Sequence, residues 1–292
     1  MRMKYTLTAL TAAVVLASGA MFADVKAAGG AEYHAERQSW SFGGMLGQYD
    51  KAQLRRGYLI YKDVCAGCHS MNLLSYRNLV QPGGPEMDAE KVKAIAAEAE
   101  IPGGFNDDGE PVTRTAKLSD RFASPYANDK EAMSANGGSM PPDLSVMAKA
   151  RGLHANHDGF IGMFSWMWGL VVDTATQYQE GGPDYIYALM TGFLDEAPEG
   201  SELPEGRYYN KFFPGNAIGM PPQLMEELVE YEDGTKATVE QLGKDISAFL
   251  MWAAEPSLNQ RKSLGLKVLL YMIILSFLLY LVKRAVWSRV KH

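Results

Sequence analysis

Cysteine is the residue that this sequence contains least of: only two occur among 292 residues, at positions 65 and 68. A structural zinc site usually needs four Cys or His ligands, so this pair alone cannot complete one. No cysteine remains to form a structural disulfide elsewhere. The sequence also lacks a nucleophile triad, a phosphate-binding loop and a pair of carboxylates placed for acid–base catalysis. No hydrolytic or phosphate-transfer chemistry is therefore indicated.

Both cysteines belong to the pentapeptide Cys65-Ala66-Gly67-Cys68-His69. Cys-x-x-Cys-His is the attachment signature of a c-type haem. On one helical turn, both thiols can reach the two vinyl groups of a single porphyrin and form thioethers. The histidine then lies under the ring, where it can ligate the iron. A redox-active dithiol would give no reason for the adjacent histidine, so the motif predicts one covalently bound haem c.

The sequence offers two candidates for the second axial ligand of the iron. An electron carrier should keep both axial positions filled, and methionine gives a higher potential than a second histidine. Met140 and Met220 each precede two prolines, which fix the following backbone. Met220 lies just before the last helix of the haem domain, where small c-type cytochromes generally carry the sixth ligand. Its position favours Met220, and Met140 remains the alternative.

Charge is distributed unevenly along the chain. The net charge is −6, but residues 261–292 carry +7 and residues 1–27 carry +2, which leaves −15 on residues 28–260. The loop at residues 195–233 alone is −8. Such an acidic body suits a basic protein partner and makes nucleic-acid binding unfavourable.

Both ends of the chain indicate a membrane context. Residues 1–27 have a basic start, an apolar stretch and a small-x-small end, as in a signal peptide; a retained membrane helix is the alternative. Residues 264–282 are nearly all apolar and long enough to cross a bilayer. The basic residues that follow place the tail in the cytoplasm and the haem domain on the periplasmic side of a bacterial inner membrane. The predicted division is a signal peptide at 1–27, a haem domain at 28–260 and an anchor with its tail at 261–292.

Helical periodicity marks the elements of the haem domain. A helix is expected from residue 51 into the haem motif, with Leu54, Tyr58 and Tyr61 on the face that packs against the domain's last helix. Tyr61 either leans against the haem edge or belongs to the core. Further helices or helical turns are expected at residues 70–79, 87–100, 144–151, 184–193 and 238–252. The helix at 87–100 is expected to be exposed, residues 106–109 to form a turn, and residues 119–143 to form a loop.

The apolar stretch at residues 159–178 is too short and too interrupted by glycine to span a membrane. Packing in the core or against a partner is favoured, and contact with the membrane interface is the alternative.

Several segments together resemble the cytochrome c1 family, the haem subunits of the ubiquinol–cytochrome c oxidoreductase (cytochrome bc1) complex. The resemblance runs from about residue 40 to the C-terminus. It is carried by Arg55-Arg56-Gly57, the haem motif with its flanking Val64, Ser70 and Met71, Lys117-Leu118-Ser119-Asp120, Pro141-Pro142-Asp143-Leu144-Ser145, Gly182-Pro183-Asp184-Tyr185, Phe213-Pro214-Gly215-Asn216-Ala217-Ile218-Gly219-Met220 and Trp252-Ala253-Ala254-Glu255-Pro256.

The resemblance implies a mainly α fold: a class I cytochrome c-like haem domain with long loops, plus one C-terminal transmembrane helix. It implies that Met220 is the sixth ligand, that Arg151 binds a propionate, and that Asn136, Pro141 and Tyr185 line the haem.

The function implied by the resemblance is electron relay. The family accepts electrons from the Rieske iron–sulfur protein, beside cytochrome b, and passes them to a soluble cytochrome c. The chain by itself is then an electron-transfer subunit and not an enzyme. Two other readings are a free-standing membrane-anchored electron carrier and an open-site haem peroxidase or sensor.

Overall fold

The computed structural model describes residues 35–151, 168, 171, 181–198, 200–201 and 203–288. The predicted signal peptide lies outside the described residues. Of the apolar stretch at 159–178, only Trp168 and Val171 are described, and both side chains are exposed.

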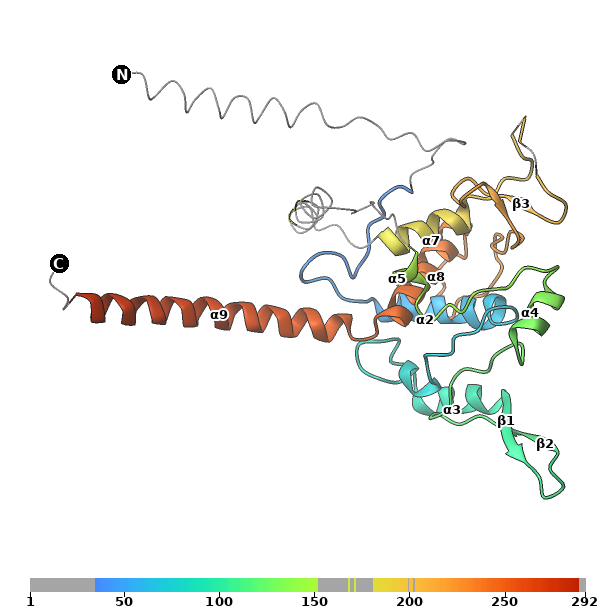
Figure 1. Cartoon of the computed structure of the whole chain (residues 1–292), viewed down its shortest axis with the longest axis horizontal. Coiled ribbons are helices and arrows are strands. Elements are labelled where there is room, and N and C mark those ends of the chain that lie inside the picture. The colour runs from blue at the N-terminus through green and yellow to red at the C-terminus, as the bar shows by residue number, and fades with distance from the viewer. Residues whose placement is uncertain are drawn as a thin grey trace. The chain divides into compact units, whose positions relative to one another are not determined.

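Three helices form the centre of the haem domain: α2 (Lys51–Ile60), α7 (Gly181–Thr191) and α8 (Val239–Ala254). Figure 1 shows α8 between α7 and α2, and α8 contacts both. The side chain of Asp50 accepts hydrogen bonds from the first backbone N–H groups of α2, which is why the helix begins there. A Cβ atom at Gly57 would lie 2.2 Å from the carbonyl oxygen of Asp245, so glycine is what lets α2 approach α8 this closely.

Aromatic packing joins α2 to α8, as the sequence predicted. The ring centroids of Tyr58 and Tyr61 each lie 5.8 Å from that of Phe249 on α8. Tyr61 also stacks on Phe122 at 5.9 Å and is only 3% exposed. Its side chain therefore belongs to the aromatic core of the domain.

The remaining elements of the domain are short. The chain continues from α2 as a π-helix, η1 (Tyr61–Cys65), which leads into the haem motif. The others are η2 (Tyr76–Leu79), α3 (Ala89–Ala97), β1 (Glu100–Phe105), β2 (Pro111–Thr115), α4 (Asp129–Ala135), α5 (Met147–Ala150), β3 (Tyr208–Tyr209) and β4 (Ala217–Ile218). The antiparallel pairs are β1–β2 and β3–β4.

Three sequence-based expectations for this part of the chain need correction. The helix expected to be exposed, α3, does expose most of its residues, but it fully buries Val92 and Ala96 against the core because it packs on η2. The expected loop at residues 119–143 contains α4, which begins where the Asn128 side chain accepts from two backbone N–H groups. The β1–β2 hairpin was not expected, since its strands contain proline and glycine and lie largely exposed. Its turn at residues 106–109 was predicted correctly.

The C-terminal helix α9 (Leu258–Trp287) has 30 residues and is long and apolar enough to cross a membrane. Most of its side chains are exposed, whereas Leu258 at its start is 1% exposed. Hydrogen bonds attach the base of α9 to the haem domain: Asn259 Oδ1 accepts from the Tyr49 backbone N–H at 3.1 Å. This helix matches the predicted anchor and begins six residues earlier than the apolar run.

Candidate haem site

The haem motif occupies a single turn at the end of the π-helix. The backbone N–H of Cys68 donates to the Cys65 carbonyl at 3.1 Å, and that of His69 donates to the same carbonyl at 2.9 Å. Cys65 is half-buried and Cys68 is exposed. The turn therefore holds both thiols and the imidazole next to one another, as the sequence predicted.

The imidazole of His69 is oriented by a loop from elsewhere in the chain. Its Nδ1 lies 2.8 Å from the backbone carbonyl oxygen of Pro142. A carbonyl can only accept, so Nδ1 carries the proton and Nε2 is left with a lone pair for a metal. Burial lowers the pKa of His69, although the Pro142 carbonyl and Asp143 act against it. The neutral imidazole that binds iron is thus the favoured form.

The thiol of Cys65 differs from that of a redox-active cysteine. Burial, assisted by the neighbouring Cys68 thiol, raises the pKa of Cys65 to about 12. Redox Cys-x-x-Cys motifs instead lower a thiol pKa, because the thiolate is the nucleophile.

Asp143 fastens the segment after His69 to the Pro141-Pro142 loop, a role that the sequence analysis missed. One carboxylate oxygen accepts from Ser70 Oγ and from the Asn72 backbone N–H, both at 2.8 Å. The other accepts from the Ser145 backbone N–H at 2.8 Å. Burial would raise the pKa of Asp143, but these hydrogen bonds outweigh it and hold the pKa below its usual range. The Asp-x-Ser sequence was the available signal, since Asp often accepts from the N–H two residues on.

A cavity of about 460 Å³ adjoins Cys68 and is lined in part by Met140, Pro141 and Tyr126. Asn136 does not line it, but its side-chain amide donates to the hydroxyl of Tyr126 at 3.0 Å. Two of the predicted haem-lining residues, Asn136 and Pro141, thus lie on the same side of the motif.

Both candidate methionines lie on segments that touch each other. A Cβ atom at Gly219 would lie 2.6 Å from Ser139 Oγ, so the residue before Met220 packs against the residue before Met140. Met220 follows β4 and is half-buried, whereas Met140 is 46% exposed. The segments that carry the two methionines are therefore neighbours, and the choice between the methionines rests on the family resemblance.

Arg151 and Tyr185 lie together on neighbouring elements. Arg151 follows α5, and Gly182 at the start of α7 approaches it so closely that a Cβ there would lie 3.0 Å from the Arg151 carbonyl oxygen. Burial raises the pKa of Tyr185, and the positive charge of Arg151 partly offsets this. The Arg151 side chain is exposed.

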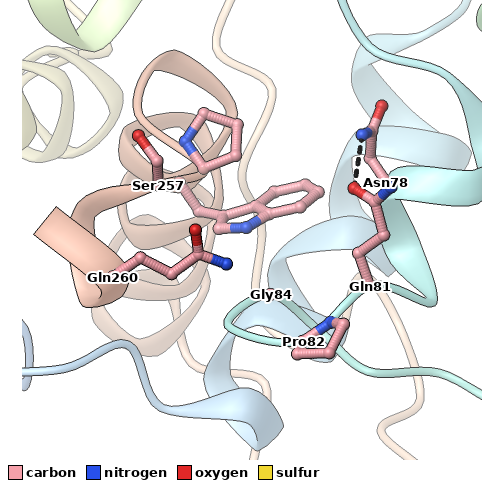
Figure 2. Close-up of a pocket in the computed structure, with 8 residues that line it drawn as sticks. Asn78, Gln81, Pro82, Gly84, Ser257 and Gln260 are labelled. Atoms are coloured by element: carbon pink, nitrogen blue, oxygen red, sulfur yellow. Dashed lines mark hydrogen bonds between the residues drawn. The ribbon is translucent and has the colours of Figure 1, made fainter.

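A second cavity, of about 400 Å³, lies at the base of α9 and contains no residue of the haem motif. Figure 2 shows Ser257 and Gln260 on one side of it, with Gln81 and Asn78 opposite. The side-chain amide of Asn78 donates a hydrogen bond to Gln81 Oε1 at 2.9 Å. Because none of its lining residues belongs to the motif, this cavity is not the candidate haem site.

Comparison with known proteins gives a match to the Cytochrome C1 family over residues 40–290. This chain belongs to the cytochrome c1 family. It is 44% identical to a cytochrome c1 of Blastochloris viridis over 96% of this chain and 95% of the relative. It is 40% identical to the "Cytochrome b-c1 complex catalytic subunit, mitochondrial" of Candida albicans over 98% of this chain and 88% of the relative. A "Cytochrome b/c1" of Bradyrhizobium diazoefficiens is 42% identical, and this chain spans 40% of its length.

Membership of the cytochrome c1 family confirms the predicted relationship and the predicted fold class. The described part of the chain is mainly helical, with one C-terminal apolar helix. The family also makes the chain a haem protein of electron transport.

Proposed function

We propose that this chain is the haem-carrying electron relay of a ubiquinol–cytochrome c oxidoreductase. In this proposal it accepts electrons from a Rieske iron–sulfur protein and passes them to a soluble cytochrome c. The observation that carries the proposal concerns His69, which lies one turn after Cys65: its Nδ1 contacts the Pro142 carbonyl, which leaves Nε2 free to bind iron. The relatives' names add support, because one names cytochrome b and c1 in a single chain and another names a cytochrome b-c1 complex.

The proposed haem ligands and attachment points are all residues of this chain. Cys65 and Cys68 would form the thioethers, and His69 Nε2 and Met220 would hold the iron. The bound haem c supplies reversible one-electron redox chemistry. The Pro142 carbonyl holds the His69 ring in one tautomer and orientation, which keeps Nε2 available. A site filled by two protein ligands leaves no open position for a substrate, which suits electron transfer.

Four further residues are proposed to surround the haem: Arg151, Asn136, Pro141 and Tyr185. The guanidinium of Arg151 is the group that would pair with a propionate, since Arg recognises carboxylates through a planar fork of N–H donors. Tyr185 lies within the electrostatic reach of Arg151. Asn136 and Pro141 are on the Cys68 side. These four residues are proposed to shape the haem site and set its electrostatic field, and none of them is proposed to move a proton.

The proposed topology is a single membrane pass. Residues 1–27 act as a signal peptide, residues 28–260 form the haem domain on the periplasmic side of a bacterial inner membrane, and residues 261–292 hold the anchor and a cytoplasmic tail. The length and composition of α9 support the anchor, and the seven basic residues at 261–292 support the orientation.

Gentle purification of the full-length chain from membranes tests the function. We expect a dihaem cytochrome b and a Rieske protein to accompany it, and added ubiquinol to reduce its haem within that assembly. Removal of the Rieske protein should abolish the ubiquinol-dependent reduction, while ascorbate still reduces the haem. Recovery of the chain without either partner would instead support a free-standing electron carrier.

A further inference from the structure

A loop of the haem domain is clamped to the first turns of α9. The side-chain ammonium of Lys262 donates to the backbone carbonyls of Phe42 and Gly44 at 2.5 and 2.6 Å. Phe42 is fully buried and packs on Tyr49, whose backbone N–H donates to Asn259 of α9. Two separate contacts therefore hold residues 42–49 against the base of the helix.

The tip of this loop presents two apolar side chains to the outside. Met45 is 54% exposed and Leu46 is 70% exposed. The turn itself is tight: Gly44 has a φ of 66°, and a Cβ at Gly47 would lie 1.8 Å from the Gly43 carbonyl oxygen. The exposed pair is thus carried by a closed turn in which glycine is required, and not by a loose segment.

The position of the loop along α9 places it at the level of the lipid headgroups. The apolar run begins at Leu264, two residues after Lys262, a rise of about 3 Å along the helix. Residues 264–282 then span about 28 Å, close to the thickness of a hydrocarbon core. Headgroups extend each face of a bilayer by a further 5 to 7 Å or so. Carbonyls that bind the Lys262 ammonium must lie close to this layer.

We propose that residues 42–47 form a second, interfacial membrane contact, with Met45 and Leu46 inserted among the lipids beside α9. The inference rests on the proposed membrane anchor, because it takes its depth from α9. Interfacial segments bury apolar side chains about 5–10 Å into the boundary between headgroups and acyl chains. Two contacts with the membrane, one spanning and one interfacial, would restrict rotation of the haem domain about the anchor.

Charge favours lipid as the occupant over another protein surface. Residues 42–49 contain no Asp or Glu, although residues 28–260 together carry −15. Lys262, which donates to uncharged carbonyls, adds positive charge at the same level, which attracts anionic headgroups; the neighbouring Arg261 is paired with Glu255 at 2.5 Å. An acid-free apolar tip with adjacent basic residues is the combination that interfacial segments use.

The test uses the full-length, haem-loaded protein, together with whatever subunits accompany it, in vesicles of phosphatidylcholine and phosphatidylglycerol. With Cys65 and Cys68 taken up by the proposed thioethers, Leu46→Cys introduces the one free thiol of this chain for a nitroxide label, and the same labelling of the unsubstituted protein gives the background from accompanying subunits. Collision with oxygen, which prefers lipid, is compared with collision with a water-soluble nickel chelate. We expect the oxygen-to-nickel ratio at position 46 to be several-fold higher than at a matched apolar position in water. Phe105→Cys on β1 is that control, because Phe105 is 75% exposed.

A third labelled variant, Leu264→Cys, separates the two proposals. If position 264 is in lipid and position 46 behaves like position 105, the interfacial contact is wrong and the anchor stands. If the labels at positions 46 and 264 are both in water, the proposed membrane anchor is itself wrong. A label at position 46 that neither reagent reaches would show a protein partner on the loop and overturn the assignment to lipid. Lys262→Ala should lower the ratio at position 46 and leave that at position 264 unchanged.

Discussion

The Nδ1 atom of His69 lies 2.8 Å from the backbone carbonyl oxygen of Pro142, 73 residues further along the chain. This contact assigns the proton to Nδ1 and directs Nε2 away from the loop. Because the acceptor is a backbone atom in an Xaa-Pro-Pro segment, its position depends on the loop conformation and not on a side chain. The lone pair of Nε2 is thereby left available to a metal.

The identity of the second ligand leads to the first prediction. In the haem-loaded protein, Met220→Leu should lower the reduction potential, abolish the near-infrared methionine–iron band and let carbon monoxide bind the reduced haem, because a thioether ligand is lost. Met140→Leu is the matched control, since its segment touches that of Met220. Loss of the band in the Met140 variant and its retention in the Met220 variant would reverse the assignment.

Among the ion pairs of the described chain segments, those made by Arg56 should stabilise the domain most. Its guanidinium contacts the carboxylate of Asp245 at 2.8 Å, and Asp245 is fully buried. Burial opposes the charge of Arg56, but Asp245 and Asp233 outweigh it and raise the pKa of Arg56. Arg56→Met would leave a buried carboxylate unpaired and should lower the free energy of unfolding by roughly 3–5 kcal/mol.

The control for Arg56 is a surface ion pair. Lys91 contacts Glu232 at 2.5 Å, but both side chains are largely exposed. Lys91→Met should therefore cost less than about 1 kcal/mol. Denaturant unfolding of the haem-loaded proteins in detergent measures both, and equal losses would show that burial does not decide the strength of the Arg56 contact.

Asp120 should make stability depend on pH in the acid range. The Arg114 guanidinium, through a 2.7 Å contact, and the backbone N–H of Lys117 lower the pKa of Asp120 from 3.8 to about 2. A lowered pKa in the folded state means that the stabilisation is complete above pH 3.8 and is lost as pH falls towards 2. The unfolding midpoints of the wild type and Asp120→Asn should differ by a constant amount above pH 4 and converge near pH 2. A difference that persists unchanged at pH 2 would contradict the shift.

Removal of α9 tests how the haem domain is held at the membrane. A chain that stops before Leu264 should be exported, loaded with haem and recovered mainly in the soluble periplasmic fraction, because the spanning helix is gone. Lys262 remains in this product, so the clamp to Phe42 and Gly44 is retained. Full recovery of the truncated chain with membranes would indicate a second strong anchor, and residues 159–178 would be the first segment to delete.

The acidic surface should accelerate the encounter with a basic acceptor. Electrostatic steering weakens as salt is added, because the Debye length falls to about 8 Å at physiological ionic strength. Glu98, Glu100, Asp107 and Asp108 are all exposed at or near the β1–β2 hairpin. If this face is used, their replacement by Asn and Gln should flatten the salt dependence of the second-order rate of electron transfer to a soluble cytochrome c.

Residues in the second acidic region provide the comparison. Glu199, Glu202 and Glu205 belong to the segment at residues 195–233, whose net charge is −8; the first two lie outside the described residues. Replacing these three with Gln should flatten the salt dependence if the acceptor docks there instead. An unchanged slope in both multiple variants would mean that the acidic surface does not steer the acceptor and that docking is apolar.

Features that depend on residues close together in the chain could be predicted from the sequence. The haem motif needs only five consecutive residues, and the anchor needs only a long apolar run, so both could be recognised without a structure. The aromatic face of α2 followed from helical periodicity, and its packing on the domain's last helix was predicted for that reason; the structure shows that Phe249 is the contact. The cytochrome c1 family was likewise recognised from short segments.

Contacts between atoms far apart in the chain became known from the three-dimensional fold. No local pattern in the sequence pairs His69 with the Pro142 carbonyl, Asp143 with Ser70, or Lys262 with Phe42. The burial of Val92 and Ala96 in α3 was missed for the same cause, since an alanine-rich charged helix has a weak apolar stripe and its partner surface comes from another segment. Loop backbones have no repeating hydrophobic period, so their positions are set by long-range hydrogen bonds and packing, which a linear pattern does not contain.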